Sequence, residues 1–107
     1  MDLDGPMAAP DHHRVVFENE RVRVFETVIR AGDRTPLHTH LTPHVVIIST
    51  GSQFVRRDQT GAITFDTRAA DPAFVMPVYS WSEGLSAHTL ENTGTDDLTA
   101  TSIEIKP

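Results

Sequence analysis

The chain of 107 residues contains no cysteine, and this absence removes three kinds of chemistry at once. Disulfide bonds, thiolate metal ligands and a cysteine nucleophile are all excluded. Basic residues are also scarce, because nine lysines and arginines face fifteen acids and give a formal net charge of -6 at pH 7. The basic surface that nucleic acid or an anionic membrane would require is therefore missing. We expect neither as a partner.

Long hydrophobic runs are missing too. The longest apolar stretch, VVII at 45–48, is far too short to span a bilayer. Residues 1–13 carry acids, glycine and prolines, and they lack the apolar run of a secretory signal. We expect this segment to be a flexible leader that ends in two solvated histidines, His12 and His13. Residues 14–107 then form a single domain of a cytoplasmic protein.

Short segments with β patterns fill most of that domain, and no stretch shows a convincing helical period. Apolar residues alternate over 21–29, and β-branched residues dominate 44–50. Glycine, proline, aspartate and asparagine turns separate the segments. About eight short strands at regular spacing predict an all-β sandwich or barrel. The predicted strands further along the chain are 53–57 and 62–66, which form a hairpin, then 74–81 with a break at Pro77, 85–92 and 98–105.

Three of the six histidines lie within seven positions, at His38, His40 and His44. In a strand, His38 and His40 would project from the same face roughly 6.5–7 Å apart, so both could lean toward one metal ion. His44 follows Pro43, where the chain can bend and turn this ring to the same centre. His88 lies on another strand, as a pocket inside a closed sheet would need. The plainer alternative is that these histidines are packing residues, because an H-x-H pair alone is a weak signal.

On these residues the sequence resembles a small single-domain cupin of the RmlC-like jelly-roll superfamily. The first cupin motif is G-x5-H-x-H-x3,4-E-x6-G. Its two glycines and two histidines are matched at the motif's spacing, with His44 where the glutamate would stand; the matching residues are Gly32, His38, His40 and Gly51. The resemblance covers roughly residues 20–105.

The second cupin motif, G-x5-P-x-G-x2-H-x3-N, is matched only at its end, by His88 and Asn92. Pro77, Glu83 and Leu85 stand where that motif has its first glycine, its proline and its last glycine. The turn before His88 therefore departs from the family pattern. The resemblance implies a cupin-type jelly-roll β-barrel or sandwich that holds a metal ion inside, and it also implies a homodimer.

A histidine in place of the motif's glutamate changes the expected metal chemistry. With His38, His40, His44 and His88 as ligands, all donors are nitrogen, which favours Fe, Ni or Zn, with Cu or Mn as further candidates. If His44 does not reach the ion, three histidines leave more open positions for a substrate. Cupins with histidine-only ligation include dioxygenases, so the resemblance implies a metal-dependent enzyme, dioxygenase-like or using other Lewis-acid chemistry, that acts on a small organic anion. The alternatives are a non-catalytic cupin that binds or senses a small ligand and a metal-free structural cupin.

Other candidates for chemistry are weaker. Glu83 and Tyr79 are the candidates for a catalytic acid or base, and each has an ordinary surface or packing role as its alternative. Gln53, Arg56 and Trp81 are the candidates for binding the small-molecule ligand or substrate. Arg56 is chosen because one of the two arginines at 56 and 57 could point inward and hold a carboxylate.

Overall fold

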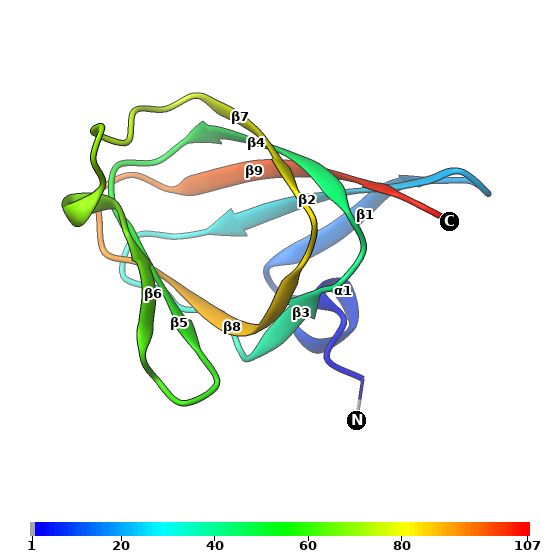
Figure 1. Cartoon of the computed structure of the whole chain (residues 1–107), viewed down its shortest axis with the longest axis horizontal. Helices are drawn as coiled ribbons and strands as arrows, with labels where there is room; N and C mark the ends of the chain where they lie inside the picture. Colours follow the sequence, from blue (N-terminus) through cyan, green and yellow to red (C-terminus); the bar gives the residue numbers. More distant parts are fainter. Residues whose placement is uncertain (1) are drawn as a thin grey trace.

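Two antiparallel sheets face each other and enclose the interior (Figure 1). The computed structural model describes residues 2–107, and nine strands lie within them. The larger sheet has the order β1-β2-β9-β4-β7 and the smaller one β3-β8-β5-β6. The strands are β1 His13–Glu18, β2 Val22–Ile29, β3 His38–His40, β4 His44–Thr50, β5 Phe54–Asp58, β6 Ile63–Asp66, β7 Val78–Ser82, β8 Leu85–Asn92 and β9 Leu98–Ile105. This architecture confirms the predicted all-β jelly roll.

Most strands coincide with the segments predicted from alternation and turn residues. On β2 the alternation separates the two faces as expected, because Phe25 and Ile29 are fully buried whereas Val28 is exposed. Pro77 ends the preceding loop, and β7 begins only at Val78 and forms an edge of the larger sheet. That position suits a segment after proline, which has no N–H to donate to a central ladder.

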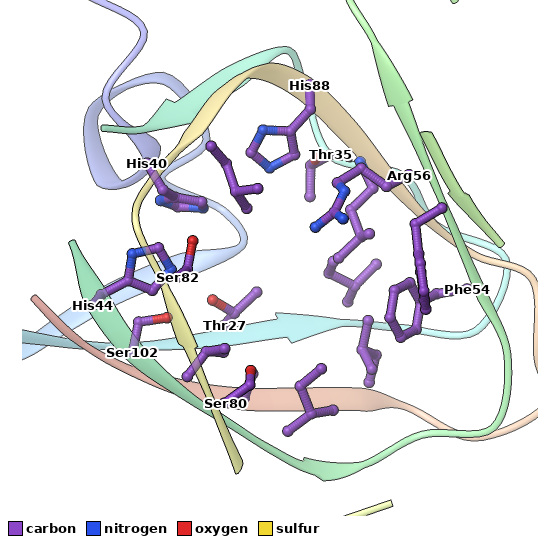
Figure 2. Close-up of a pocket in the computed structure, with 18 of the residues that line it drawn as sticks. Thr27, Thr35, His40, His44, Phe54, Arg56, Ser80, Ser82, His88 and Ser102 are labelled. Carbon is purple, nitrogen blue, oxygen red and sulfur yellow. Dashed lines mark hydrogen bonds between the residues drawn. The ribbon is translucent and has the colours of Figure 1, made fainter. Parts of the chain in front are cut away.

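The apolar core fills only one end of the space between the sheets. Ile29, Phe54 and Leu98 are its buried centre. The rings of Phe54, Phe65 and Phe74 pack against one another with centroids 5.4–5.6 Å apart. The other end of the interior holds polar side chains, which Figure 2 shows on the side opposite Phe54. The fold therefore places a hydrophobic layer beside a buried polar site.

Residues 2–13 form defined structure, which differs from the flexible leader predicted over 1–13; Met1 lies outside the described residues. Residues Gly5–Ala8 form the short helix α1, and Ala9 is fully buried. The Asp4 carboxylate accepts two hydrogen bonds from the Arg23 guanidinium, each 2.8 Å long. A side chain at Gly5 would collide with the His40 ring, so this helix packs directly on the interior. No helix within residues 2–107 is long and apolar enough to cross a membrane.

Asn92 ties the end of β8 to its surroundings and is 1% exposed. Its side-chain amide donates to the backbone oxygens of Ile29 and Asp96, each at 2.8 Å, and its oxygen accepts from the Gly94 N–H at 3.0 Å. All three bonds stabilise the turn between β8 and β9 against the end of β2. Asn92 thus has a structural role, four residues after His88 on the same face of the strand.

We predict that Asn92→Asp destabilises the fold by about 2 kcal/mol or more, because a carboxylate would face two carbonyl oxygens and leave them without donors. Asn19→Asp is the matched control. The Asn19 side chain only accepts hydrogen bonds, from the N–H groups of Arg21 and Val22 in an exposed turn, so aspartate can replace it at a cost below about 0.5 kcal/mol. Urea unfolding at pH 7 measures both; equal effects of the two substitutions would contradict this role.

Candidate metal centre

Five of the six histidines lie buried at one end of the interior, and four different strands supply them. Each is at most 8% exposed. His13 begins β1, His38 and His40 are the two ends of β3, His44 begins β4, and His88 lies in the middle of β8. Such a group is not a solvated surface feature, and it requires partners or an ion.

Three of these rings come closest to one another. The ligand nitrogens of His13, His38 and His40 all lie within 4.8 Å of each other. The ring centroids are 4.8 Å apart for His13 and His38, 5.1 Å for His13 and His40, and 4.8 Å for His38 and His40. Imidazoles at these separations can converge on one ion.

His88 and His44 lie beside this group. His88 is the cross-strand partner of His38, and its ring centroid lies 4.3 Å from that of His38 and 5.4 Å from that of His40. The His44 centroid is 5.9 Å from that of His40. The structure thus brings the histidines of β3 and β8 together across the smaller sheet. Their role as metal ligands, and that of His44, stays a prediction.

The prediction that His13 is solvated is wrong. His13 is 5% exposed, and it reaches the interior because α1 turns back under the barrel and the Ala9 carbonyl accepts a hydrogen bond from its Nδ1 at 3.0 Å. Neither cupin motif contains a histidine at this place, so motif matching could not find it. The available signal was the run of β-branched and aromatic residues that follows it in HRVVFE, which favours a strand that begins near His13.

Hydrogen bonds set the tautomer of four of the rings. The Nδ1 atoms of His38, His44 and His88 each lie 2.8 Å from a backbone carbonyl oxygen two residues earlier, and His13 has the equivalent bond to Ala9. A carbonyl oxygen can only accept, so each Nδ1 carries the proton and each Nε2 offers its lone pair. This is how histidine ligands are oriented in metal sites.

His40 is the exception, because its Nδ1 is buried without a hydrogen-bond partner among residues 2–107. Burial also lowers the pKa values of four of the rings. It takes the pKa of His13 and that of His88 from 6.5 to about 4, and it lowers those of His38 and His40 as well. Neighbouring histidines add to the shift at His40. These rings are therefore neutral at pH 7, which is the form that binds a metal.

The histidines line one end of a cavity of about 380 Å³ between the sheets. Figure 2 shows His40 and His44 on one side, Phe54 on the opposite side, and Arg56 beside His88 with its guanidinium directed inward. Hydroxyl side chains also line the cavity, with Ser82 and Ser102 beside His44 and with Thr27 and Ser80 nearer the middle. The cavity therefore combines a nitrogen-rich side, an aromatic side and one guanidinium.

The weaker candidates are distributed differently. Arg56 lines the cavity, and Trp81 contacts it while remaining 52% exposed. Tyr79 does not line it, because it is 71% exposed on the outer face of β7. Glu83 lies in the turn after β7, outside the cavity, and accepts a hydrogen bond from the Trp81 indole at 2.9 Å. Gln53 is also outside the cavity and binds the Thr67 hydroxyl.

The lowered pKa values predict that the metal-free protein loses stability in acid. The unfolded chain takes up protons near pH 6.5, whereas His13 and His88 stay neutral in the folded protein until about pH 4. The free energy of unfolding therefore falls between these limits, by about 1.4 kcal/mol per pH unit for each such proton. Urea unfolding after chelator treatment measures the slope. His13→Gln should make the slope shallower, and an unchanged slope would contradict the assignment.

Comparison with protein-family models and with curated proteins finds no match. Solved structures do match. A cupin domain from Bordetella pertussis Tohama I is 24% identical, with a TM-score of 0.71 over 89% of this chain and 92% of that one. An RmlC-like cupin family protein with a double-stranded β-helix fold, from Methanocaldococcus jannaschii, is 13% identical, with a TM-score of 0.65 over 88% and 78%. A predicted oxalate decarboxylase from Thermotoga maritima is 18% identical, with a TM-score of 0.57 over 89% and 79%. Architecture and structural neighbours agree, and the chain has the fold of a small RmlC-like cupin.

Proposed function

We propose that the chain is a metal-binding cupin whose ion is held by His13, His38 and His40, with His88 next to them. The observation that carries this proposal is the set of hydrogen bonds that orient the imidazole rings. Four of the five buried rings donate through Nδ1 to backbone carbonyls, which leaves Nε2 free for an ion. An all-imidazole set suits Fe, Ni or Zn better than Mg or Ca.

The cavity supports a small organic molecule as the substrate. A bound transition metal would supply Lewis-acid or redox chemistry to an oxygen of that molecule. The protein would bind the molecule beside the histidines and orient it through Arg56 and the hydroxyl groups of the cavity, while the aromatic side excludes water. One structural neighbour is described as a predicted oxalate decarboxylase, which supports a small organic acid as the substrate class.

A non-catalytic function in ligand binding is the second candidate. Among the described residues that line the cavity, no aspartate, glutamate, lysine or tyrosine is present. Proton transfer would then depend on a histidine or on the substrate itself.

The predicted homodimer stays a prediction, and a partner copy would cover exposed apolar residues on the outer face of the larger sheet, such as Val28, Tyr79, Trp81 and Ile105.

Metal content after purification without a histidine tag tests the proposal. We expect about one Zn or Co per chain after incubation and dialysis, with a Co(II) absorption spectrum typical of nitrogen ligands. His38→Ala or His40→Ala should abolish binding, and His13→Ala should weaken it by about 10-fold or more. A content below about 0.2 metal per chain would remove the metal-binding function.

His12→Ala is the matched control. This neighbouring histidine is not among the three whose nitrogens converge, and it pairs with Asp33 at 2.9 Å, so metal affinity should not change. Circular dichroism shows whether each variant is folded. If His13→Ala binds metal as tightly as the unchanged protein, His13 is not a ligand, and the set is the one predicted from the motifs.

A further inference from the structure

We propose that Arg56 binds the carboxylate of the substrate, and that the substrate is a monocarboxylic acid with an apolar body. The inference rests on the proposed function only in that it concerns the same cavity. It concerns the part of the cavity between His88 and Phe54, away from His40.

The backbone of β5 fixes the direction of Arg56. Its register partner on β8 is Leu90, and both residues line the cavity. Arg57, the next residue, takes the opposite face and forms an ion pair with Glu91 at 2.9 Å. The side chains of these two adjacent arginines thus lie on opposite faces of the sheet, because successive side chains of a strand alternate between its faces. In Figure 2 the Arg56 guanidinium points to the middle of the cavity, between His88 and Phe54.

The Arg56 guanidinium has no hydrogen-bond or ion-pair partner among residues 2–107. The nearby Asp58 forms no ion pair with it, and the Asp58 Oδ1 accepts hydrogen bonds within its own turn, from Thr60 and Ala62. Burial lowers the pKa of Arg56, yet a guanidinium remains protonated at pH 7. A positive charge facing an apolar cavity is costly without a counterion, and a carboxylate from a ligand would provide one.

The surroundings of Arg56 select for the rest of the ligand. Its Cζ lies 5.7 Å from the centroid of the Phe65 ring, a cation–π contact that holds the guanidinium plane while leaving its donors free. The neighbouring cavity wall is formed by Phe54, Phe74 and Leu90. A second carboxylate against this wall would be desolvated without a partner. A cavity of about 380 Å³ has the volume of roughly a dozen waters, which suits a medium-sized acid.

Binding of two matched probes tests this inference. The probes are 3-phenylpropanoate and its neutral amide, 3-phenylpropanamide, titrated into the full chain by calorimetry or by NMR, both zinc-loaded and metal-free. We expect the acid to bind about 10-fold or more tightly than the amide. Arg56→Gln should remove this preference while changing amide binding less than about 2-fold, and Arg57→Gln should leave both affinities unchanged.

The inference is overturned if Arg56→Gln retains the preference, or if the unchanged protein does not bind the acid at millimolar concentration. It is also overturned if the preference depends on zinc and not on Arg56, because the acid then binds the ion. Should Arg56→Gln fail to fold, two further observations decide: Arg56→Lys should retain the preference for the acid, and the Arg56 Nε–H signal of the unchanged protein should move with the acid and not with the amide. Metal content is measured separately, so a protein that takes up no metal yet prefers the acid refutes only the proposed function.

Discussion

The rest of the site depends on one constraint, which is that five imidazoles must be buried together in a small space. The fold meets it by giving four of them a backbone carbonyl for Nδ1, so that each ring is fixed in direction and tautomer before any ion arrives. Three of these carbonyls lie two residues before the histidine, so the local strand geometry supplies them. The histidines then require little from the apolar core, which explains how a small barrel keeps a polar site at one end and a hydrophobic layer at the other.

Many of the strands and most of the histidine group could be predicted from the sequence, because short local patterns indicate them. Alternation and turn residues identified the strand that begins at His44 and the one that holds His88, and the two-residue period of a strand placed His38 and His40 on one face. The registers of β3 with β8 and of β5 with β8 then turned these local patterns into a shared cavity. Glu83 and Tyr79 were poor candidates for a physical reason, since a turn residue and an outward strand position do not face the interior.

The fold of the N-terminal segment and the burial of His13 could not be predicted, because both depend on contacts between distant parts of the chain. Residues 1–13 look like a leader by composition, because proline, glycine and acids are typical of mobile termini. Nothing in that composition reveals that the Asp4 carboxylate meets Arg23, or that Arg23 also binds Glu104 from the other end of the chain. These ion pairs are buried enough to fix the segment, and they bring His13 into the group. A local sequence pattern does not predict these ion pairs, because each partner alone resembles an ordinary surface charge.

The position of His13 on strand β1 has a consequence for how an ion would be captured. β1 is an edge strand of the larger sheet, and β3 is an edge strand of the smaller one, whereas β8 lies between two neighbours. Edge strands separate from a sheet at lower free energy than central ones. Of the neighbouring rings, only His88 lies on a central strand, whereas His13, His38 and His40 all lie on edge strands. Opening of these two short edge strands would therefore admit or release an ion without unfolding the central strands of either sheet.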